Sequence, residues 1–326
     1  MISAEEKKYL YFLTSSYWKG EGNIVEIGPW LGGSTYCLAS GLSTSKHYRG
    51  QKIYVYDNFI WREFMGLRAN LELNDNDDFL PFFKENLKDY SDYIVAFKES
   101  LPDESVPNDK DALTKRQLEF SPSELIHYDS KEKVEILFID GAKSWSGTRY
   151  LLEVFHHSLI PNTTLLVCQD YKYWGCYWVI MIFEILKDKM EIEHILPYNS
   201  VSFKLTQPIS KEDISNIPSL DEIDIDLGIS MIKKASQRIG KLDGIESSVI
   251  IELNAVKFLA HKGEEERAHR YLIDLISWYP FYKSKEIFKP IVNWFAKSYD
   301  QKIDLKDSLY WKLRTVLASM YRKLRS

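Results

Sequence analysis

Short apolar runs separated by helix-like segments are the feature that most constrains the fold of this chain. Five such runs come first, at residues 24–27, 52–57, 93–97, 134–140 and 164–170. Runs of this length that alternate with helical segments are typical of βαβ units, whose strands pair in parallel. Two further runs, at 191–196 and 201–205, flank Pro-Tyr-Asn-Ser, which predicts a terminal antiparallel pair. We therefore expect an α/β fold with a doubly wound, seven-stranded and mostly parallel sheet.

A change of pattern after residue 206 predicts a second domain. Residues 207–223 combine Pro and Ser with several acids, as expected for a linker. From residue 224 to residue 326 the pattern is helical, with expected breaks at Gly240, Gly244, Gly263, Pro280 and near Gln301. We predict a first domain at 1–206 and an all-α domain at 224–326, which is either a small helical bundle or a tetratricopeptide-like array.

Charge and composition exclude several classes of partner. Hydrophobic residues make up 45% of the chain, and a net charge of -5 offers no basic field for nucleic acid. No run reaches the roughly 20 apolar residues of a membrane helix. Cys37, Cys168 and Cys176 lack the spacing of metal ligands, which favours a reducing compartment. We expect a cytoplasmic protein that binds small molecules, whose helical domain can form a homo-oligomer or bind a protein partner.

Residues 22–35 predict a ligand-binding turn between the first strand and a helix. They read Gly-Asn-Ile-Val-Glu-Ile-Gly-Pro-Trp-Leu-Gly-Gly-Ser-Thr, with Ser34 or Thr35 as the expected helix N-cap. Glycines there allow positive φ and a close approach of ligand to backbone. The spacing differs from the Gly-x-Gly-x-x-Gly of dinucleotide sites, which disfavours the alternative of an NAD-linked oxidoreductase. We assign the following residues to S-adenosylmethionine, with the Glu26 acid near its ammonium group: Glu26, Gly28, Pro29, Trp30, Gly32, Gly33 and Ser34.

Polar residues at the ends of the next runs extend the predicted cofactor site. Asp57 ends the second run and is followed by Asn58. An acid on the strand beside the switch point can accept hydrogen bonds from a ribose diol, and each such bond contributes about 1.5–3 kcal/mol. We assign Glu99 and Ser100, after the third run, to the adenine side of the site. Asp140, at the end of the fourth run, completes the cofactor set.

Three blocks of the chain resemble a known enzyme family. Residues 22–34 are similar to the first motif of the macrocin O-methyltransferase family of sugar methyltransferases, and their Glu-x-Gly-x-x-x-Gly-x-Ser core is similar to that of catechol O-methyltransferase. Asp-Tyr-Lys-Tyr-Trp-Gly-Cys at 170–176 resembles the family's Asp-Tyr-x-x-Trp-x-Gly-Cys block after the fifth strand, and Phe-Ile-Asp-Gly at 138–141 resembles its fourth-strand end. The resemblance spans about residues 5–205. It implies a class I methyltransferase that transfers a methyl group to a sugar hydroxyl.

The resemblance also implies where the chemistry takes place. A neutral hydroxyl is a poor nucleophile, so methyl transfer needs a base or a metal that lowers its pKa. In the resembled family, acids after the fourth and fifth strands hold a divalent cation. Carried over, Asp140 and Asp170 are the catalytic residues, and Mg²⁺ would be held by Asp140, Gln169 and Asp170.

The chain departs from the family beside both acids. Ala142 and Lys143 follow Asp-Gly where the family has a further Asp, and Gln169 stands where the family has the first Asp of Asp-Asp-Tyr. Lys143 would repel a metal and is expected to pair with Asp140 or Asp170. Two hypotheses stay open, a magnesium-dependent site and a metal-free site with Asp140 as general base. The same departures support an alternative function, a cofactor-binding scaffold without turnover that acts through its helical tail.

Overall fold

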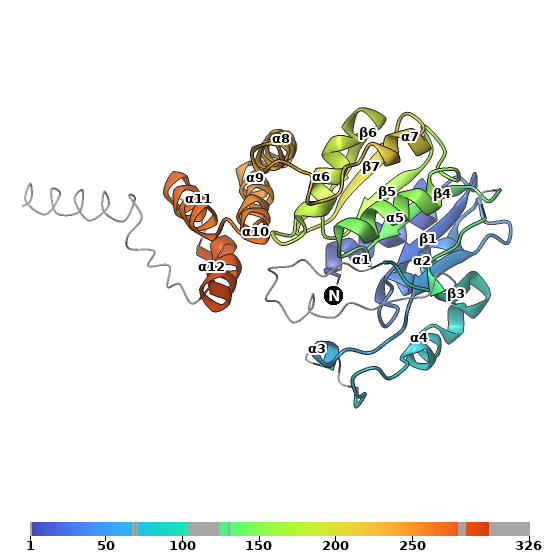
Figure 1. The fold of residues 1–326 in the computed structure, drawn as a ribbon. Helices are drawn as coiled ribbons and strands as arrows, with labels where there is room; N and C mark the ends of the chain where they lie inside the picture. The colour runs from blue at the N-terminus through green and yellow to red at the C-terminus, as the bar shows by residue number, and fades with distance from the viewer. Residues whose placement is uncertain are drawn as a thin grey trace, which may run out of the picture. The chain divides into compact units, whose positions relative to one another are not determined.

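One sheet of seven strands, in the order β3-β2-β1-β4-β5-β7-β6, organises the first part of the molecule (Figure 1). All neighbours pair in parallel except β7, which is antiparallel to both β5 and β6. This is the strand order of the class I methyltransferase fold, so the predicted fold class is confirmed. The strands are β1 (Asn23–Ile27), β2 (Ile53–Asp57), β3 (Ile94–Lys98), β4 (Val134–Ile139), β5 (Leu165–Cys168), β6 (Met190–Ile195) and β7 (Val201–Leu205).

The structure is a computed structural model that describes residues 2–66, 69, 71–102, 124–129, 131–279 and 285–299. These residues fall into two compact units. The first holds residues 2–102, 124–171 and 185–218, and the second holds 172–184 together with the helices after residue 218. The segment after β5 thus belongs with the C-terminal helices, whereas the boundaries 1–206, 207–223 and 224–326 remain a proposal about folding domains.

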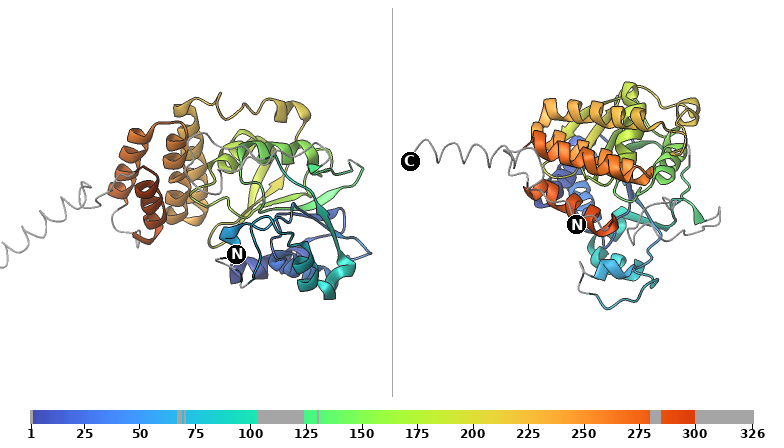
Figure 2. Two further views of the ribbon diagram at one scale, coloured as in Figure 1. Left: turned by 60° about the horizontal axis from the view of Figure 1, so that its bottom comes forward. Right: turned by 60° about the vertical axis from the view of Figure 1, so that its left-hand side comes forward.

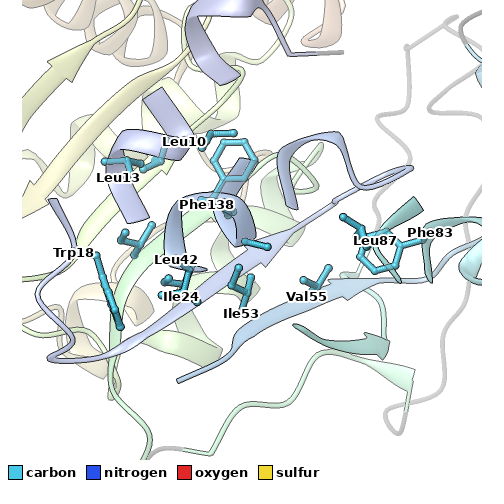
Figure 3. Packing of buried hydrophobic residues seen from close by; sticks show 14 of the residues in the cluster. Leu10, Leu13, Trp18, Ile24, Leu42, Ile53, Val55, Phe83, Leu87 and Phe138 are labelled. Carbon is cyan, nitrogen blue, oxygen red and sulfur yellow. The ribbon is translucent and has the colours of Figure 1, made fainter. Parts of the chain in front are cut away.

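The first unit buries one face of its sheet under helices from the N-terminal half. Alternate strand residues such as Ile24, Val55 and Phe138 pack with Leu10 and Leu42, and all are 1% exposed or less (Figure 3). The period of two along each strand puts these side chains on one face. The helical segments that precede β4 are α1 (Ala4–Phe12), the π-helical η1 (Leu13–Tyr17), α2 (Gly33–Thr44), α3 (Glu63–Gly66), α4 (Leu80–Asn86) and η2 (Lys88–Tyr93).

Helix α5 (Trp145–Phe155) supplies buried apolar side chains to the core of the first unit, Leu151 and Phe155 among them. The ring of Phe155 lies edge-on to that of Tyr56, with centroids 6.3 Å apart. Ser144 caps the helix by accepting from the amide of Gly147 at 3.0 Å. The remaining helical segments of this unit are η4 (Lys187–Lys189) and α7 (Lys211–Ser215), and α7 falls inside the predicted linker.

All regular secondary structure in the described residues of the second unit is helical, and α8 to α11 lie side by side (Figure 2). The predicted break at Gly244 is confirmed and the predicted break at Gly240 is wrong. An added Cβ at Gly240 would lie 2.8 Å from Ser248 Cβ, so this glycine allows α8 to pack closely on α9. The predicted breaks at Pro280 and near Gln301 lie outside the described residues. The helices are α6 (Tyr177–Ile185), α8 (Ile225–Asp243), α9 (Ile245–Glu252), α10 (Asn254–His261), α11 (Glu265–Trp278) and α12 (Lys285–Tyr299).

In the second unit, half-buried ion pairs and a hydrogen bond join α6 and the residues before it to the later helices. Arg238 of α8 contacts Glu184 of α6 at 2.5 Å, and Lys172 contacts Asp243 at 2.8 Å. The hydroxyl of Tyr177 lies 2.9 Å from His261 Nδ1. Lys172 and Glu184 are buried while their partners are 32% and 35% exposed, so leaving either buried charge unpaired would be destabilising. None of the helices in the described part of the chain has the length and apolar composition that a bilayer crossing requires.

Candidate functional site

Backbone hydrogen bonds join the carboxyl ends of the parallel strands one residue beyond each strand. The amide of Gly28 donates to Tyr56 at 3.0 Å, that of Asp140 to Ile27 at 2.9 Å, and that of Gln169 to Ile139 at 3.0 Å. The amide of Glu99 donates to Asp57 at 3.0 Å. The predicted site residues at the ends of β1 to β5 are therefore held along one edge of the sheet. In open α/β sheets, ligands bind at this edge.

The loops after β1 and β4 touch through two glycines. Gly28 has a φ of +81°, and an added Cβ would lie 2.7 Å from both the amide nitrogen and the Cα of Gly141. Real Cβ atoms are essentially never found so close to backbone, so position 28 needs glycine for its conformation and for its space. At Gly33 an added Cβ would meet no atom within 4 Å. The turn is thus closed on one side by Gly141 and open at Gly33.

Glu26 is fully buried in β1 and is bound by the first turn of α2. The hydroxyls of Ser34 and Thr35 donate to its two carboxylate oxygens, the latter at 2.6 Å. Burial raises the pKa of Glu26 to about 7, while these hydrogen bonds oppose the increase. The prediction of Ser34 or Thr35 as N-cap was wrong. Gly32, with a φ of +90°, holds the N-cap position, so both hydroxyls are left to bind Glu26.

Asp57 stands at the end of β2 with one carboxylate oxygen engaged. Its Oδ1 accepts from the amide of Phe59 at 2.7 Å, and Asn58 Oδ1 accepts from the amide of Ile60 at 3.0 Å. No hydrogen bond from the described residues reaches Asp57 Oδ2. Burial raises the pKa of Asp57 to about 7, and the negative charge of Asp140 adds to the increase. A carboxylate with an open oxygen at this position can accept from a ribose hydroxyl.

The remaining predicted cofactor residues have local structural roles. The carbonyl of Pro29 accepts from the amide of Gly32 at 2.9 Å, which closes the glycine turn. Trp30 has a φ of +48°, and its buried indole N–H has no acceptor among the described residues. Glu99 accepts from the amide of His127 at 2.8 Å, and Ser100 forms a backbone bridge to Leu125. Glu99 and Ser100 therefore bind the backbone of residues 124–127.

Four side chains at the ends of β4 and β5 form one polar cluster, which consists of Asp140, Lys143, Gln169 and Asp170. The Lys143 ammonium contacts Asp140 Oδ1 at 3.0 Å and also contacts Asp170 Oδ2. The expected pairing of Lys143 with the acids is thus confirmed for both of them. Oriented with its amide nitrogen toward the acids, Gln169 donates to Asp140 Oδ1 and to Asp170 Oδ1, each at 2.8 Å.

The two acids of the cluster differ in how many of their oxygens are engaged. Both oxygens of Asp170 are bound, one by Lys143 and one by Gln169, whereas both contacts to Asp140 fall on Oδ1. Asp140 Oδ2 accepts no hydrogen bond from the described residues. Burial raises the pKa of Asp140 to about 6, which the Lys143 charge opposes and the Asp170 charge supports. A quarter of the side chain, 26%, stays exposed, so solvent can reach this carboxylate.

These residues do not fit the predicted magnesium site. Mg²⁺ requires near-octahedral oxygen ligands, yet an ammonium group bridges the two acids and the Gln169 amide turns its nitrogen toward them. Two unit charges 4 Å apart repel by about 4 kcal/mol in a protein-like medium, and a divalent ion doubles this. Within the described residues, no three His, Cys, Asp or Glu side chains are placed to hold a metal.

One supporting contact was missed from the sequence. The Glu6 carboxylate accepts from the Ser200 hydroxyl, which also donates to the backbone carbonyl of Gln169 at 3.3 Å. Glu6 closes a capping box with Ser3 at the start of α1. The Ser-x-x-Glu spacing signals that helix start, but nothing local signals a partner 194 positions away.

Comparisons with known proteins give the following. No protein-family model and no curated protein sequence matches the chain. Among solved structures, the O-methyltransferase NovP is 15% identical, with 62% of this chain and 78% of that chain covered and a TM-score of 0.38. A putative caffeoyl-CoA O-methyltransferase from Staphylococcus aureus is 13% identical, with 63% and 85% covered and a TM-score of 0.39. The calicheamicin methyltransferase CalS11 is 14% identical, with 61% and 76% covered and a TM-score of 0.40. At TM-scores below 0.5, the fold assignment rests on the strand order and directions described above.

Proposed function

We propose that this chain is an S-adenosylmethionine-dependent O-methyltransferase that acts on a hydroxyl of a small molecule, a sugar or glycan-linked metabolite. The observation that carries the proposal is the placement of two open carboxylate oxygens beside one glycine turn. Asp57 Oδ2 lies at the end of the strand on one side of β1, and Asp140 Oδ2 at the end of the strand on the other side. A nucleoside-binding acid and a base for the acceptor are thus both provided.

The residues of the turn fit the cofactor. Gly33 leaves space beside the backbone, and the buried indole N–H of Trp30 faces no acceptor in the described chain. The Asp57 carboxylate suits the ribose diol. Glu26 holds the first turn of α2 through Ser34 and Thr35, so it fixes the backbone beside the cofactor as well as adding negative charge near the ammonium group.

Asp140 and Asp170 have different roles in the proposed reaction. S-adenosylmethionine supplies a methyl group already activated on sulfur. Asp140 Oδ2 takes the proton of the acceptor hydroxyl as that oxygen bonds to the methyl carbon. The carbon–sulfur bond breaks with its electron pair left on sulfur, which gives S-adenosylhomocysteine and a methyl ether. Asp170, with both oxygens bound, positions Lys143 and Gln169, and general-base catalysis of this kind contributes about 10²- to 10⁴-fold.

We also propose the chemical class of the acceptor and the location of the protein in the cell. The similarity of residues 22–34 and 170–176 to the macrocin family supports a sugar hydroxyl as acceptor. Cys37, Cys168 and Cys176 are not in disulfide bonds, and Cys168 and Cys176 are buried, which supports a cytoplasmic location. Labelled S-adenosylmethionine with a panel of nucleotide sugars and free glycosides, followed by mass detection of the product, tests the acceptor.

The proposal is tested by binding and turnover measured together. Calorimetry should show S-adenosylmethionine and S-adenosylhomocysteine binding at one site per chain, and the acceptor panel should release S-adenosylhomocysteine. Binding without release on any acceptor would favour the alternative of a scaffold. The engaged oxygens of Asp170 and Asp140 Oδ1 give that alternative its specific support. Lack of affinity for either nucleoside would reject both.

A further inference from the structure

The cluster at the ends of β4 and β5 contains its own cation. Lys143 follows Asp140 by three residues, at the start of the loop that leads into α5, and its ammonium group reaches acids from two neighbouring strands. The Gln169 amide nitrogen supplies a second bridge between the same two acids, at 2.8 Å to each. Two donors therefore occupy three of the four carboxylate oxygens.

We infer that Lys143 takes the place of a divalent cation, so that the protein has no resident metal at this edge. The ammonium neutralises part of the charge of Asp140 and Asp170 and holds the two carboxylates together, which is what a bridging metal ion would otherwise do. An ammonium group brings one charge and three donors on a flexible stem. It leaves Asp140 Oδ2 open, whereas a metal ion draws its carboxylate oxygens into its coordination shell.

The inference predicts a gain of binding when the lysine charge is removed. Lys143→Met keeps most of the side-chain length and leaves Asp140 and Asp170 without the Lys143 ammonium group that bridges them. Without that charge, two acids held by neighbouring strands provide the first oxygen ligands of a site for a hard cation such as Mg²⁺ or Mn²⁺. Nearly half of the Lys143 side chain, 48%, is exposed, so the substitution leaves the core of the first unit intact.

Lys98 offers a matched control. Its side chain is also 48% exposed, it is the last residue of β3 in the same sheet, and it forms an ion pair with Asp78 at 2.6 Å. Lys98→Met therefore removes the same charge from a surface ion pair but leaves only one carboxylate. It should acquire no cation site.

The experiment is titration of purified full-length protein with MnCl₂, with free Mn²⁺ followed by electron paramagnetic resonance and MgCl₂ used as competitor. Wild type and Lys98→Met should show no saturable site below about 1 mM, while Lys143→Met should bind one Mn²⁺ at least tenfold more tightly. Adding Asp140→Asn to Lys143→Met should abolish the gained site. Lys143→Gln serves as a second neutral variant if thermal melting shows that Lys143→Met is unfolded.

Two outcomes would overturn the inference: a stoichiometric micromolar Mn²⁺ site in the wild type, or equal Mn²⁺ affinities in the wild type and both neutral variants. The extension to catalysis rests on the proposed methyltransferase function, and there wild-type turnover should be unchanged by EDTA. The Mn²⁺ titration contains no S-adenosylmethionine, so a failure of the methyltransferase proposal leaves its result intact.

Discussion

Two halves of the same sheet edge bear acids that are compensated in opposite ways. On the β1 and β2 side, Glu26 and Asp57 receive hydrogen bonds from hydroxyls and a backbone amide, and the pKa of each is raised to about 7. On the β4 and β5 side, Lys143 brings a full positive charge to Asp140 and Asp170. We propose that the first half binds the cationic, hydroxyl-rich cofactor. In the second half, the Lys143 side chain itself supplies the positive charge beside the two acids.

The largest expected effect separates the two halves by function. Asp140→Asn removes the proposed base but keeps an oxygen and the volume of the side chain, so turnover should fall about 10²- to 10⁴-fold. Cofactor affinity should stay within about twofold, because Asp57, the proposed ribose-binding acid, lies on the other half. Release of S-adenosylhomocysteine and calorimetry measure the two effects. Retained turnover, or a larger loss in Asp170→Asn than in Asp140→Asn, would contradict the assignment of Asp140 as base.

The next largest effect concerns stability and the contact between Gly28 and Gly141, which joins the two halves. Gly28→Ala puts a Cβ 2.7 Å from the Gly141 backbone at a positive φ, so the free energy of unfolding should fall by about 2–4 kcal/mol. Gly33→Ala meets no atom within 4 Å, and its unfolding free energy should stay within about 1 kcal/mol of wild type. Urea denaturation measures both. Because the cofactor is expected to lie against Gly33, Gly33→Ala should nevertheless weaken S-adenosylmethionine binding, and unchanged binding would place the cofactor elsewhere.

A smaller effect tests Asp57, the proposed ribose-binding acid of the first half. Asp57→Ala should weaken S-adenosylmethionine at least tenfold, about 1.4 kcal/mol, because a charge-assisted hydrogen bond to the diol is lost. Asp57→Asn keeps the acceptor for the Phe59 amide and so separates the loss of charge from any change in the turn. Asp78→Ala, on an exposed ion pair, is the control and should bind like wild type. Calorimetric affinities equal to wild type in both Asp57 variants would remove this residue from the site.

The smallest expected effect is a pH dependence of cofactor affinity. With a pKa of about 7, Asp57 is mostly protonated at pH 6 and mostly ionised at pH 8. The ionised form is the better acceptor, so affinity should increase severalfold as pH rises through about 7. The same titration of Asp57→Asn should lose the part of this increase that Asp57 contributes, while Glu26, whose pKa is also raised to about 7, keeps its own part. An affinity that falls over this range in the wild type would show that the protonated acid is the binding form.

The fold was predictable because each strand carries its own apolar run. Those runs gave all seven strands to within a residue or two, and the antiparallel end of the sheet followed from the Pro-Tyr-Asn-Ser connection. Gly240 misled the prediction of the helices, since glycine there permits close packing of α8 on α9 rather than a break. The grouping of residues 172–184 with the C-terminal helices depends on distant ion pairs such as Arg238 with Glu184, which no local pattern reports.

The candidate site was predictable in its residues and less so in their bonds. The positions of Asp57 and Asp140 follow from strand ends, which the apolar runs locate. Ser34 and Thr35 can donate to Glu26 because Gly32, in the left-handed conformation, is the N-cap residue of α2. The direction of the Gln169 amide is decided by acids on two strands and an ammonium group from a third position, so it emerges only when the chain is folded.

The glycine contact couples the two halves mechanically. Since no side chain separates the backbones at Gly28 and Gly141, we expect a movement of the first loop on ligand entry to displace Gly141, the residue directly after Asp140. Ligand binding at the β1 and β2 side can thereby change the direction in which the Asp140 carboxylate points. In more distant relatives, both positions are expected to remain glycine, because a methyl group on either one would press the loops apart.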